Sequence, residues 1–312
     1  MKRYDVLSVG DINVEITMTN LTSMPVLGRE VLSEGILTTL GGSTVNTAVG
    51  LAVQGVKSAF VGKLGRDDNA AFLRRELASY GVDGSYLAVD ETAPTGVTVS
   101  LSTAGDRAMV TCVGAIGTLC EGDVSDELLQ SARHLHVGGY FLQPALRPGL
   151  PALFRRAHEA GLTVSFDTGW DDSGQWGGNL RELLAMTDIF LPNESEALAI
   201  TGESDVPTAA RKLAEKVKIA VVKWGRHGAC LCSGEKFVKL PAYRGKPVDT
   251  TGAGDAFNAG FLTAYVNGMA LEDCLRWGLA SGSISVTRLG SAASCPNRAD
   301  IEKMIASNET EA

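Results

Sequence analysis

From about residue 130 onward, the chain alternates short runs of apolar, β-branched residues with amphipathic stretches that end near a glycine. Parallel βαβ units produce this rhythm, because a helix must return the chain to the same end of the sheet after each strand. The sequence therefore predicts an α/β fold with a doubly wound, mostly parallel sheet and helices on both faces. Strands are expected at 162–169, 187–193 and 218–225, and helices at 150–161 and 206–217.

The N-terminal part follows the same rhythm. Helices are expected at 44–55 and 67–81, on either side of a strand around 59–61. No repeat and no Pro/Gly-rich linker divides the chain. Residues 1–312 are therefore interpreted as a single α/β domain.

Two inserted segments break the rhythm, at about 13–40 and 95–113. Both show alternating strand patterns with no helix in between, which favours antiparallel strands in a separate small sheet or lid. Thr95-Gly96 and a turn at Gly105-Asp106-Arg107 belong to the second segment. A lid of this kind is expected to close over a ligand and to exclude water.

Charge and apolar patterning argue against several classes of function. A formal net charge of −8 disfavours a nucleic-acid-binding protein, whose phosphate contacts need clustered Lys and Arg. The N-terminus runs from two basic residues directly into a strand pattern, without the apolar region of a signal peptide, and no run approaches the roughly 18 apolar residues of a membrane span. The six cysteines are scattered and lack metal-ligand spacing. A cytoplasmic protein is expected.

The strongest local signal is the run of small residues Gly252-Ala253-Gly254, followed by Asp255 and an apolar helix pattern. Backbone N–H groups at a helix N-terminus bind phosphate, and glycine lets the anion approach closely. Asp255 would then face the same volume from the first helical turn and could accept a proton from an attacking hydroxyl. The alternative is a helix start whose aspartate only complements the helix dipole.

Two ordered stretches of the sequence carry a resemblance to a known family. The run DTTGAGDAFNAGF at 249–261 is similar to the second signature of the ribokinase-like carbohydrate kinases, the PfkB family. GGSTVNTA at 41–48, with VGKLGRD at 61–67, resembles the first signature. The resemblance covers nearly the whole chain. It implies a ribokinase-like fold and an ATP-dependent kinase that transfers the γ-phosphoryl group to a hydroxymethyl group of a small sugar.

The resemblance also implies roles for particular residues. Asp255 would be the general base beside Gly252, Ala253 and Gly254. Glu15 replaces the usual Asp at its position, which leaves its role open. The residues expected to contact the substrate are Asp11, Asn13, Gly41, Gly42 and Asn46.

Further residues are implied for the nucleotide and for cations. Asn193 and Glu196 match an N-x-x-E element that acts on Mg²⁺ through its water shell, although an N-cap Asn with a first-turn Glu would by itself stabilise a helix. Lys223, Gly225 and Gly228 match a nucleotide loop in which Thr is common at the first position. Potassium ligands are implied near Asp249, Thr251 and 286–291.

The acceptor is expected to be an unphosphorylated sugar such as ribose or fructose, because the implied substrate contacts are rich in neutral hydrogen-bonding groups. A nucleoside or a sugar phosphate is the alternative within the family, and Arg29 and Arg107 could converge on a second phosphate or lie solvated in the lid. A non-catalytic sugar-binding regulator on the same scaffold is the alternative from a different class. The resemblance further suggests a homodimer formed through the lid.

Overall fold

The computed structural model describes residues 2–103, 107–307 and 309–310, so the predicted turn at Gly105-Asp106 lies outside this part of the chain. Its main sheet has eight strands in the order β14-β13-β12-β11-β10-β9-β1-β4. Neighbouring strands from β12 to β4 pair in parallel, whereas β13 and β14 form an antiparallel edge. The predicted mostly parallel sheet is confirmed. The strands are β1 Tyr4–Val9, β4 Ser58–Val61, β9 Ala132–Val137, β10 Thr163–Phe166, β11 Ile189–Phe190, β12 Ile219–Lys223, β13 Ala229–Ser233 and β14 Lys236–Leu240.

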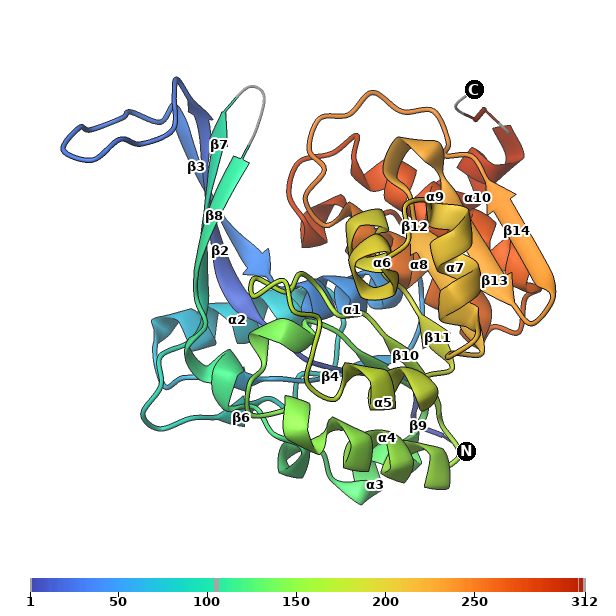
Figure 1. The fold of residues 1–312 in the computed structure, drawn as a ribbon. Helices are drawn as coiled ribbons and strands as arrows, with labels where there is room; N and C mark the ends of the chain where they lie inside the picture. The colour runs from blue at the N-terminus through green and yellow to red at the C-terminus, as the bar shows by residue number, and fades with distance from the viewer. Residues whose placement is uncertain (1, 104–106, 308, 311–312) are drawn as a thin grey trace.

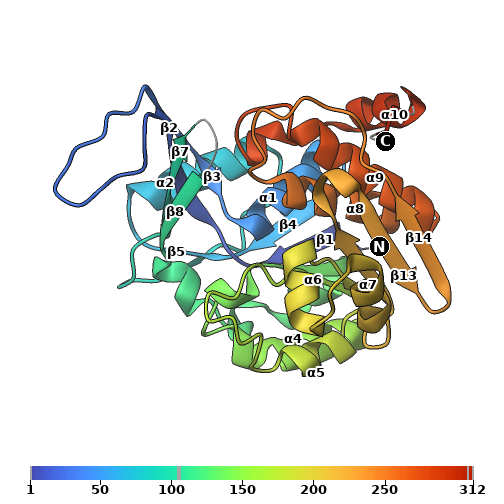
Figure 2. The same cartoon turned by 45° about the horizontal axis from the view of Figure 1, so that its top comes forward.

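Helices cover both faces of this sheet, as predicted (Figures 1 and 2). One hydrophobic cluster packs a first group of helices on one face, and a second cluster packs the others on the opposite face. The first group is α3 Asp126–Ser131, α4 Leu150–Glu159, α5 Leu180–Ala185, α6 Glu194–Thr201 and α7 Val206–Ala214. The second is α1 Ser43–Val53, α8 Ala253–Val266, α9 Leu271–Ser285 and α10 Arg298–Ser307, while α2 Asp68–Ser79 joins α1 in a third cluster near the lid.

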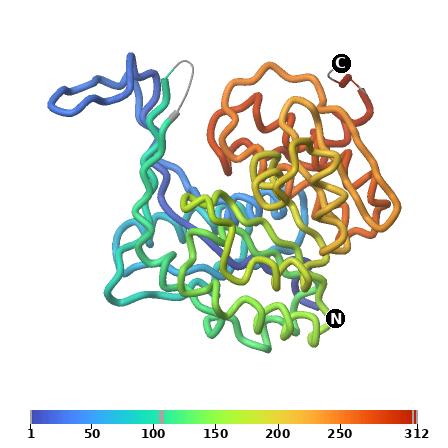
Figure 3. Tube along the Cα trace, in the orientation of Figure 1, coloured from blue at the N-terminus to red at the C-terminus, as the bar shows by residue number. Residues whose placement is uncertain are grey.

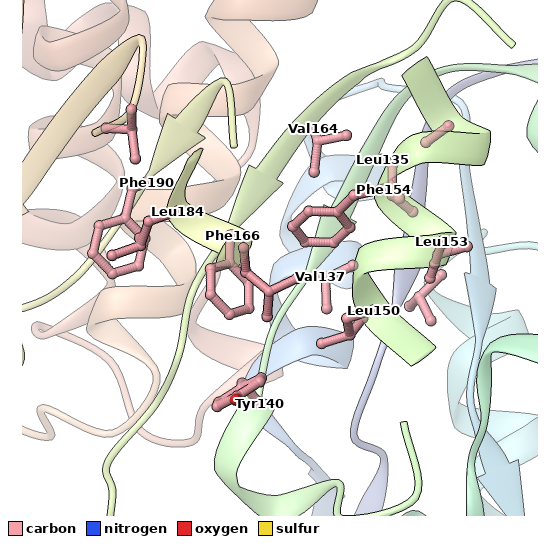
Figure 4. Packing of buried hydrophobic residues seen from close by; sticks show 14 of the residues in the cluster. Leu135, Val137, Tyr140, Leu150, Leu153, Phe154, Val164, Phe166, Leu184 and Phe190 are labelled. Atoms are coloured by element: carbon pink, nitrogen blue, oxygen red, sulfur yellow. The ribbon is translucent and has the colours of Figure 1, made fainter. Parts of the chain in front are cut away.

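Helix α4 shows how the sequence pattern produces this layering. Leu150, Leu153, Phe154 and Ala157 recur at helical spacing and are all buried. In Figure 4 the side chains of α4 face Val137, Val164 and Phe166 on β9 and β10. The helix ends where Gly161 adopts a φ of 80°, so the glycine that closes this stretch in the sequence also ends the helix.

The lid is a second sheet of four strands in the order β3-β2-β7-β8. β2 pairs antiparallel with β3, and β7 pairs antiparallel with β8, but β2 and β7 are parallel. The expectation of purely antiparallel strands was therefore wrong at this junction, because both segments leave the main body in the same direction. Figures 1 and 3 show the lid projecting from the body. Its strands are β2 Asn13–Leu21, β3 Gly35–Gly41, β7 Val97–Thr103 and β8 Arg107–Cys112.

Two smaller features complete the description. β5 Lys63–Leu64 and β6 Ala88–Val89 form a short parallel pair. Of the helices in the described residues, none has the combination of length and apolar character needed to cross a membrane.

Candidate active site

The predicted site residues gather where the parallel strands of the main sheet end. Asp11 follows β1, Asn193 follows β11, and Lys223 ends β12. Asn193 and Lys223 are joined by a parallel bridge between the ends of their strands. The first turns of α1 and α8 meet the same region, because side chains of α1 bond Asp255 of α8. Ligands of open α/β sheets bind at this edge.

Asp255 lies in the first turn of α8, and its carboxylate is held from α1. Ser43 Oγ donates a hydrogen bond to Oδ1 over 2.7 Å, and Asn46 Nδ2 donates to Oδ2 over 3.0 Å. Burial raises the pKa of Asp255 to about 7, although these two hydrogen bonds oppose the rise; the negative charge of Asp167 adds to it. A carboxylate with a pKa near neutrality is suited to accept a proton at pH 7.

Gly252, Ala253 and Gly254 form the start of α8, as the sequence predicts. Gly252 is the N-cap residue with a φ of 74°, and a Cβ there would lie 2.9 Å from Ser291. This position therefore requires glycine. Gly252 itself has no side chain to cap α8, and the N–H of Ala253 donates to the carbonyl of Thr250 over 3.3 Å. The N–H groups of the next residues, Gly254 and Asp255, also belong to the first turn, where a helix N-terminus can meet an anion.

Asp11 and Gly42 are closely tied to the start of α1. Asp11 accepts hydrogen bonds from the backbone N–H groups of Ser43, over 2.8 Å, and Thr44, over 3.0 Å. Gly42 has a φ of 116°, and a Cβ there would lie 2.7 Å from the carbonyl oxygen of Asp11. The structure thus shows Asp11 as a cap of α1, and its predicted contact with sugar hydroxyls stays a prediction.

Asn13 begins β2 and Gly41 ends β3, where the lid joins the body, and Asn46 lies in the first turn of α1. Asn13 Nδ2 donates to Thr98 Oγ1 on β7 over 3.0 Å. A Cβ at Gly41 would lie 2.7 Å from Cβ of Glu15, so the strands leave no room for a side chain. The Asn46 amide oxygen is buried and has no hydrogen-bond partner among the described residues. A buried unpaired acceptor is costly, so this oxygen is a candidate contact for a ligand hydroxyl.

Asn193 and Glu196 form a complete capping box at the start of α6. Asn193 Oδ1 accepts from the Glu196 N–H, and Glu196 Oε2 accepts from the Asn193 N–H, each over 2.9 Å. Burial, followed by the charge of Asp167, raises the pKa of Glu196 to about 7. The stabilising role that the sequence left as an alternative is therefore real, and it holds the Glu196 carboxylate where the charges of Asp167 and Lys223 act on it.

Lys223 lies in a buried charged network that the sequence did not predict. Its Nζ donates to Asp167 Oδ2 over 2.7 Å and to Asn258 Oδ1 over 3.2 Å. Asn258 Nδ2 also donates to Asp167 Oδ2, over 2.6 Å. Asp167 and Asn258, together with Ser43, are the residues that sequence reasoning missed. Each carried a signal, because Asp167 directly follows a strand and the other two lie inside the two signatures.

Gly225, Gly228 and Lys223 line a cavity of about 320 Å³ beside the start of α8. A Cβ at Gly228, where φ is 92°, would overlap the carbonyl of Leu240, so this turn also requires glycine. The lining also includes the apolar side chains of Phe257, Leu279 and Val286. Its size and mixed lining are typical of a small-molecule site.

Asp249 and Thr251 lie in the loop before α8, next to the C-terminal loop implied for a cation. Thr251 N and Oγ1 donate to Asp249 Oδ1 over 2.9 and 2.6 Å, and Gly290 N donates to Asp249 Oδ2 over 3.1 Å. The N–H groups of Val248 and Asp249 bond the carbonyl of Val286. The two implied loops are therefore adjacent, and the cation itself stays a prediction.

A model of the pfkB family carbohydrate kinases matches residues 4–298. This chain belongs to the pfkB family of carbohydrate kinases. Family membership confirms the resemblance seen in the two signatures. It also identifies the chain as a kinase, in preference to the non-catalytic alternative.

Relatives in the pfkB family extend over nearly the whole chain. ATP-dependent ribose-1-phosphate kinase of Halopiger xanaduensis is 30% identical over 287 residues, covering 91% of this chain and 93% of that protein. The structure of ribokinase from Thermotoga maritima has a TM-score of 0.85 and 27% identity, covering 97% of this chain and 99% of that one. Arabidopsis thaliana ribokinase complexed with ribose and ATP has a TM-score of 0.83 and 27% identity, covering 97% and 98%. The ribokinase-like fold is therefore confirmed.

Proposed function

We propose that this pfkB-family kinase transfers the γ-phosphoryl group of ATP to a hydroxymethyl group of a small sugar, with Asp255 as the general base. The position of Asp255 carries the proposal: it directly follows the anion cradle of Gly252–Gly254 and is held by Ser43 and Asn46 with a pKa of about 7. As the hydroxyl oxygen bonds to the γ-phosphorus, its proton passes to Asp255 and ADP leaves. The N–H groups at the start of α8 stabilise the charge on the transferred group.

The cavity beside α8 supports ATP as the phosphoryl donor. Its apolar side chains suit an adenine ring, while Lys223 and Gly254, which lie next to each other at the start of α8, would receive phosphates. The related Arabidopsis ribokinase was determined with ribose and ATP. Glu196, oriented by Asn193, would hold a magnesium ion through water, which suits an ion that keeps much of its hydration shell. When bound, Mg²⁺ neutralises charge on the nucleotide phosphates.

An unphosphorylated sugar is the proposed acceptor. The lid face that carries Asn13 also carries Glu15 and the hydroxyls of Thr98 and Thr111, which lie 3.0 Å apart. These groups, together with the unpaired amide oxygen of Asn46, suit neutral hydroxyls. Because one relative is an ATP-dependent ribose-1-phosphate kinase, the test of the acceptor also includes phosphorylated sugars.

A nucleoside is the second candidate acceptor, favoured by an aromatic cluster that the sequence did not reveal. Phe141, Trp176 and Trp170 pack edge to face in a chain, with ring centroids 5.3 Å apart in both contacts. Trp170 is 57% exposed. Gly169 lies against Gly139, at which a Cβ would contact the carboxylate of Asp11, so the cluster is close to the implied acceptor wall. Such a surface can stack on a base.

The acceptor is identified by comparing kcat/KM for ADP release across ribose, fructose, fructose 6-phosphate, ribose 1-phosphate and adenosine. We expect the free sugars to be preferred. A preference above about a hundredfold for a phosphorylated acceptor, which corresponds to roughly 2.7 kcal/mol of discrimination, would overturn the neutral-sugar assignment. A comparable preference for adenosine that is lost in Trp170→Ala would establish the nucleoside candidate.

We further propose a homodimer through the lid, supported by the distribution of apolar side chains on it. The strand register places Ile16, Met18, Val99, Leu101 and Val110 on one face, opposite the face of Asn13 and Thr98. On this apolar face Ile36 and Val110 are each 67% exposed. A second copy of the same lid would cover it, because a self-complementary surface closes by two-fold symmetry.

Two further expectations from the sequence remain predictions. Potassium activation is tested by comparing rates in potassium and in a large organic cation, with equal rates speaking against it. The cytoplasmic location is tested by cell fractionation.

A further inference from the structure

Asp167 is a buried charged residue of the site that has no assigned role. It follows β10, and its side chain is only 6% exposed. Oδ2 accepts from Lys223 Nζ and from Asn258 Nδ2, while Oδ1 accepts from the N–H of Gly169 over 3.1 Å. The Asn258 amide closes the network, because its oxygen accepts from the same lysine. Asp167, Lys223 and Asn258 thus form a rigid triad.

Stability alone is a poor reason to bury such a triad. A buried ion pair is generally no more stabilising than well-packed apolar residues of similar volume. The location of this pair gives another reason. Nζ of Lys223 lies 3.6 Å from the point that a Cβ on Gly254 would occupy, so the ammonium lies directly against the phosphate cradle. Two of its three donors have acceptors among the described residues, which leaves one for a phosphate oxygen.

The triad also decides which carboxylate the lysine pairs with. Glu196 and Asp255 both attract Lys223 electrostatically, after Asp167. If Lys223 paired with Asp255 instead, its ammonium would occupy the carboxylate that must accept the proton of the acceptor hydroxyl, and it would lower the pKa of Asp255. Burial acts to raise the pKa of Asp167, but the charge and hydrogen bond of Lys223 outweigh it, so Asp167 stays ionised.

We propose that Asp167 is a positioning residue of the phosphoryl transfer: with Asn258, it holds the Lys223 ammonium against the phosphate cradle and away from Asp255. Lys223 then contacts the terminal phosphate of the bound nucleotide. This inference rests on the proposed function, since it requires the cradle at α8 to receive that phosphate. It adds Asp167 and Asn258 to the residues on which binding of the terminal phosphate depends.

The experiment is a double-mutant cycle read by equilibrium binding. Calorimetry gives the Kd of a non-hydrolysable ATP analogue and of ADP for wild type, Asp167→Asn, Lys223→Met and the double variant. The preference for the triphosphate is the Kd of ADP divided by the Kd of the ATP analogue. Each single variant should reduce this ratio by about tenfold or more, as expected for one charge-assisted hydrogen bond. The double variant should lose no more than Lys223→Met alone, because the two residues act as a unit. Asn258→Ala tests the same network if Asp167→Asn does not fold.

A matched control lies at the opposite edge of the parallel sheet, before β11 and β12. Asp188 is buried, and Lys218, just before β12, donates to it over 2.5 Å. Asp188→Asn should lower the thermal stability without changing the preference for the triphosphate. If Asp167→Asn and Asn258→Ala behave like this control, Asp167 has a purely structural role and the proposal is wrong.

The pH dependence of kcat/KM gives a second readout, because the two charges act on Asp255 in opposite directions. Removing the negative charge in Asp167→Asn should move the acid limb to lower pH, and removing the positive charge in Lys223→Met should move it to higher pH, by about half a unit or more. Shifts in the same direction would contradict the triad. Asp255 interacts electrostatically with Asp167 after β10, Lys223 on β12 and Cys295 before α10. Glu196 on α6 and His136 on β9 interact in turn with Asp167 and Lys223, and burial keeps His136 neutral by lowering its pKa to about 4.

The two proposals fail separately. If Asp255→Asn kept normal turnover, the general-base assignment would be wrong. The binding preference of the Asp167 and Lys223 variants would still test the role of the triad. If the preference were unchanged in every variant while Asp255→Asn was inactive, only the triad would be wrong.

Discussion

Replacing Asp255 by Asn should damage turnover and stabilise the fold at the same time. The variant keeps the volume of the side chain but cannot accept the proton of the acceptor hydroxyl. We expect kcat to fall by roughly 10²–10⁴-fold, the usual loss when a general base is removed. Asp273→Asn is a matched control, since Asp273 lies in the first turn of the next helix, α9, and is exposed. It should keep wild-type kcat.

The stability effect follows from the raised pKa. The pKa of Asp255 rises from 3.8 to about 7 in the folded protein, a difference that corresponds to at most about 4 kcal/mol of free energy at pH 8. The protonated carboxyl favours the fold fully below about pH 4, and that contribution is lost as the pH rises through about 7. The asparagine side chain of the variant mimics the protonated form at every pH, and Asn46 can turn its unpaired amide oxygen toward the new amide. Because Asp255 keeps partial solvent contact, we expect a gain of about 1–2 kcal/mol at pH 8.

Chemical denaturation of both proteins between pH 4 and pH 8 measures this difference. The gap in unfolding free energy should open toward alkaline pH in favour of Asp255→Asn. A gap that opened toward acid pH, or equal stability at pH 8, would refute the burial argument. Near wild-type turnover in the pure variant would refute the catalytic one.

Three further predictions concern magnesium, the nucleotide loop and the lid. Glu196→Gln should raise the magnesium concentration needed for half activity more than it raises the sugar KM, whereas an unchanged titration would leave Glu196 as a helix cap alone. Gly228→Ala should lower the unfolding free energy by about 3 kcal/mol, because φ is positive there and the new Cβ would overlap the carbonyl of Leu240. Gly225→Ala, where φ is 52° and nothing lies near the Cβ position, should lower it by only about 1 kcal/mol, and denaturant titration measures both. In sedimentation analysis Val110→Asp should give a monomer while Thr111→Asp, on the opposite face, keeps the dimer; a wild-type monomer at all concentrations would refute the lid interface.

The sequence predicted the sheet and its helices because each depends on a local pattern. Strands such as β10 and β12 appear as short apolar runs, and the spacing of α4 repeats along its buried face. The parallel pairing of β2 with β7 was missed. The relative direction of two strands from distant segments depends on how each segment leaves the main body, and no local sequence pattern shows it. The register that separates the polar and apolar faces of the lid was invisible for the same reason.

The sequence predicted the places of Asp255 and Glu196 at the starts of helices, because each lies within a recognisable run; their functional roles stay predictions. Asp167 was missed because its position directly after a strand does not show that a lysine from another strand will reach it. The sequence shows that Lys223 stands where Thr is commoner in the family. It does not show that this lysine pairs with Asp167. A buried ammonium needs a dedicated anion, and only the folded structure shows which of the surrounding carboxylates supplies it.

The charges of the site explain why the nucleotide should arrive with a cation. Asp167 and Lys223 neutralise each other, which leaves Glu196 and Asp255 as two carboxylates whose pKa values both lie near 7. A triphosphate entering this space would raise both pKa values further, and a protonated Asp255 cannot act as a base. A divalent cation bound with the nucleotide reverses that effect, since it favours the ionised form of any carboxylate nearby. On this argument the cation both neutralises the phosphates and keeps the base ionised, so the magnesium dependence of the rate and the acid limb of its pH profile should be coupled.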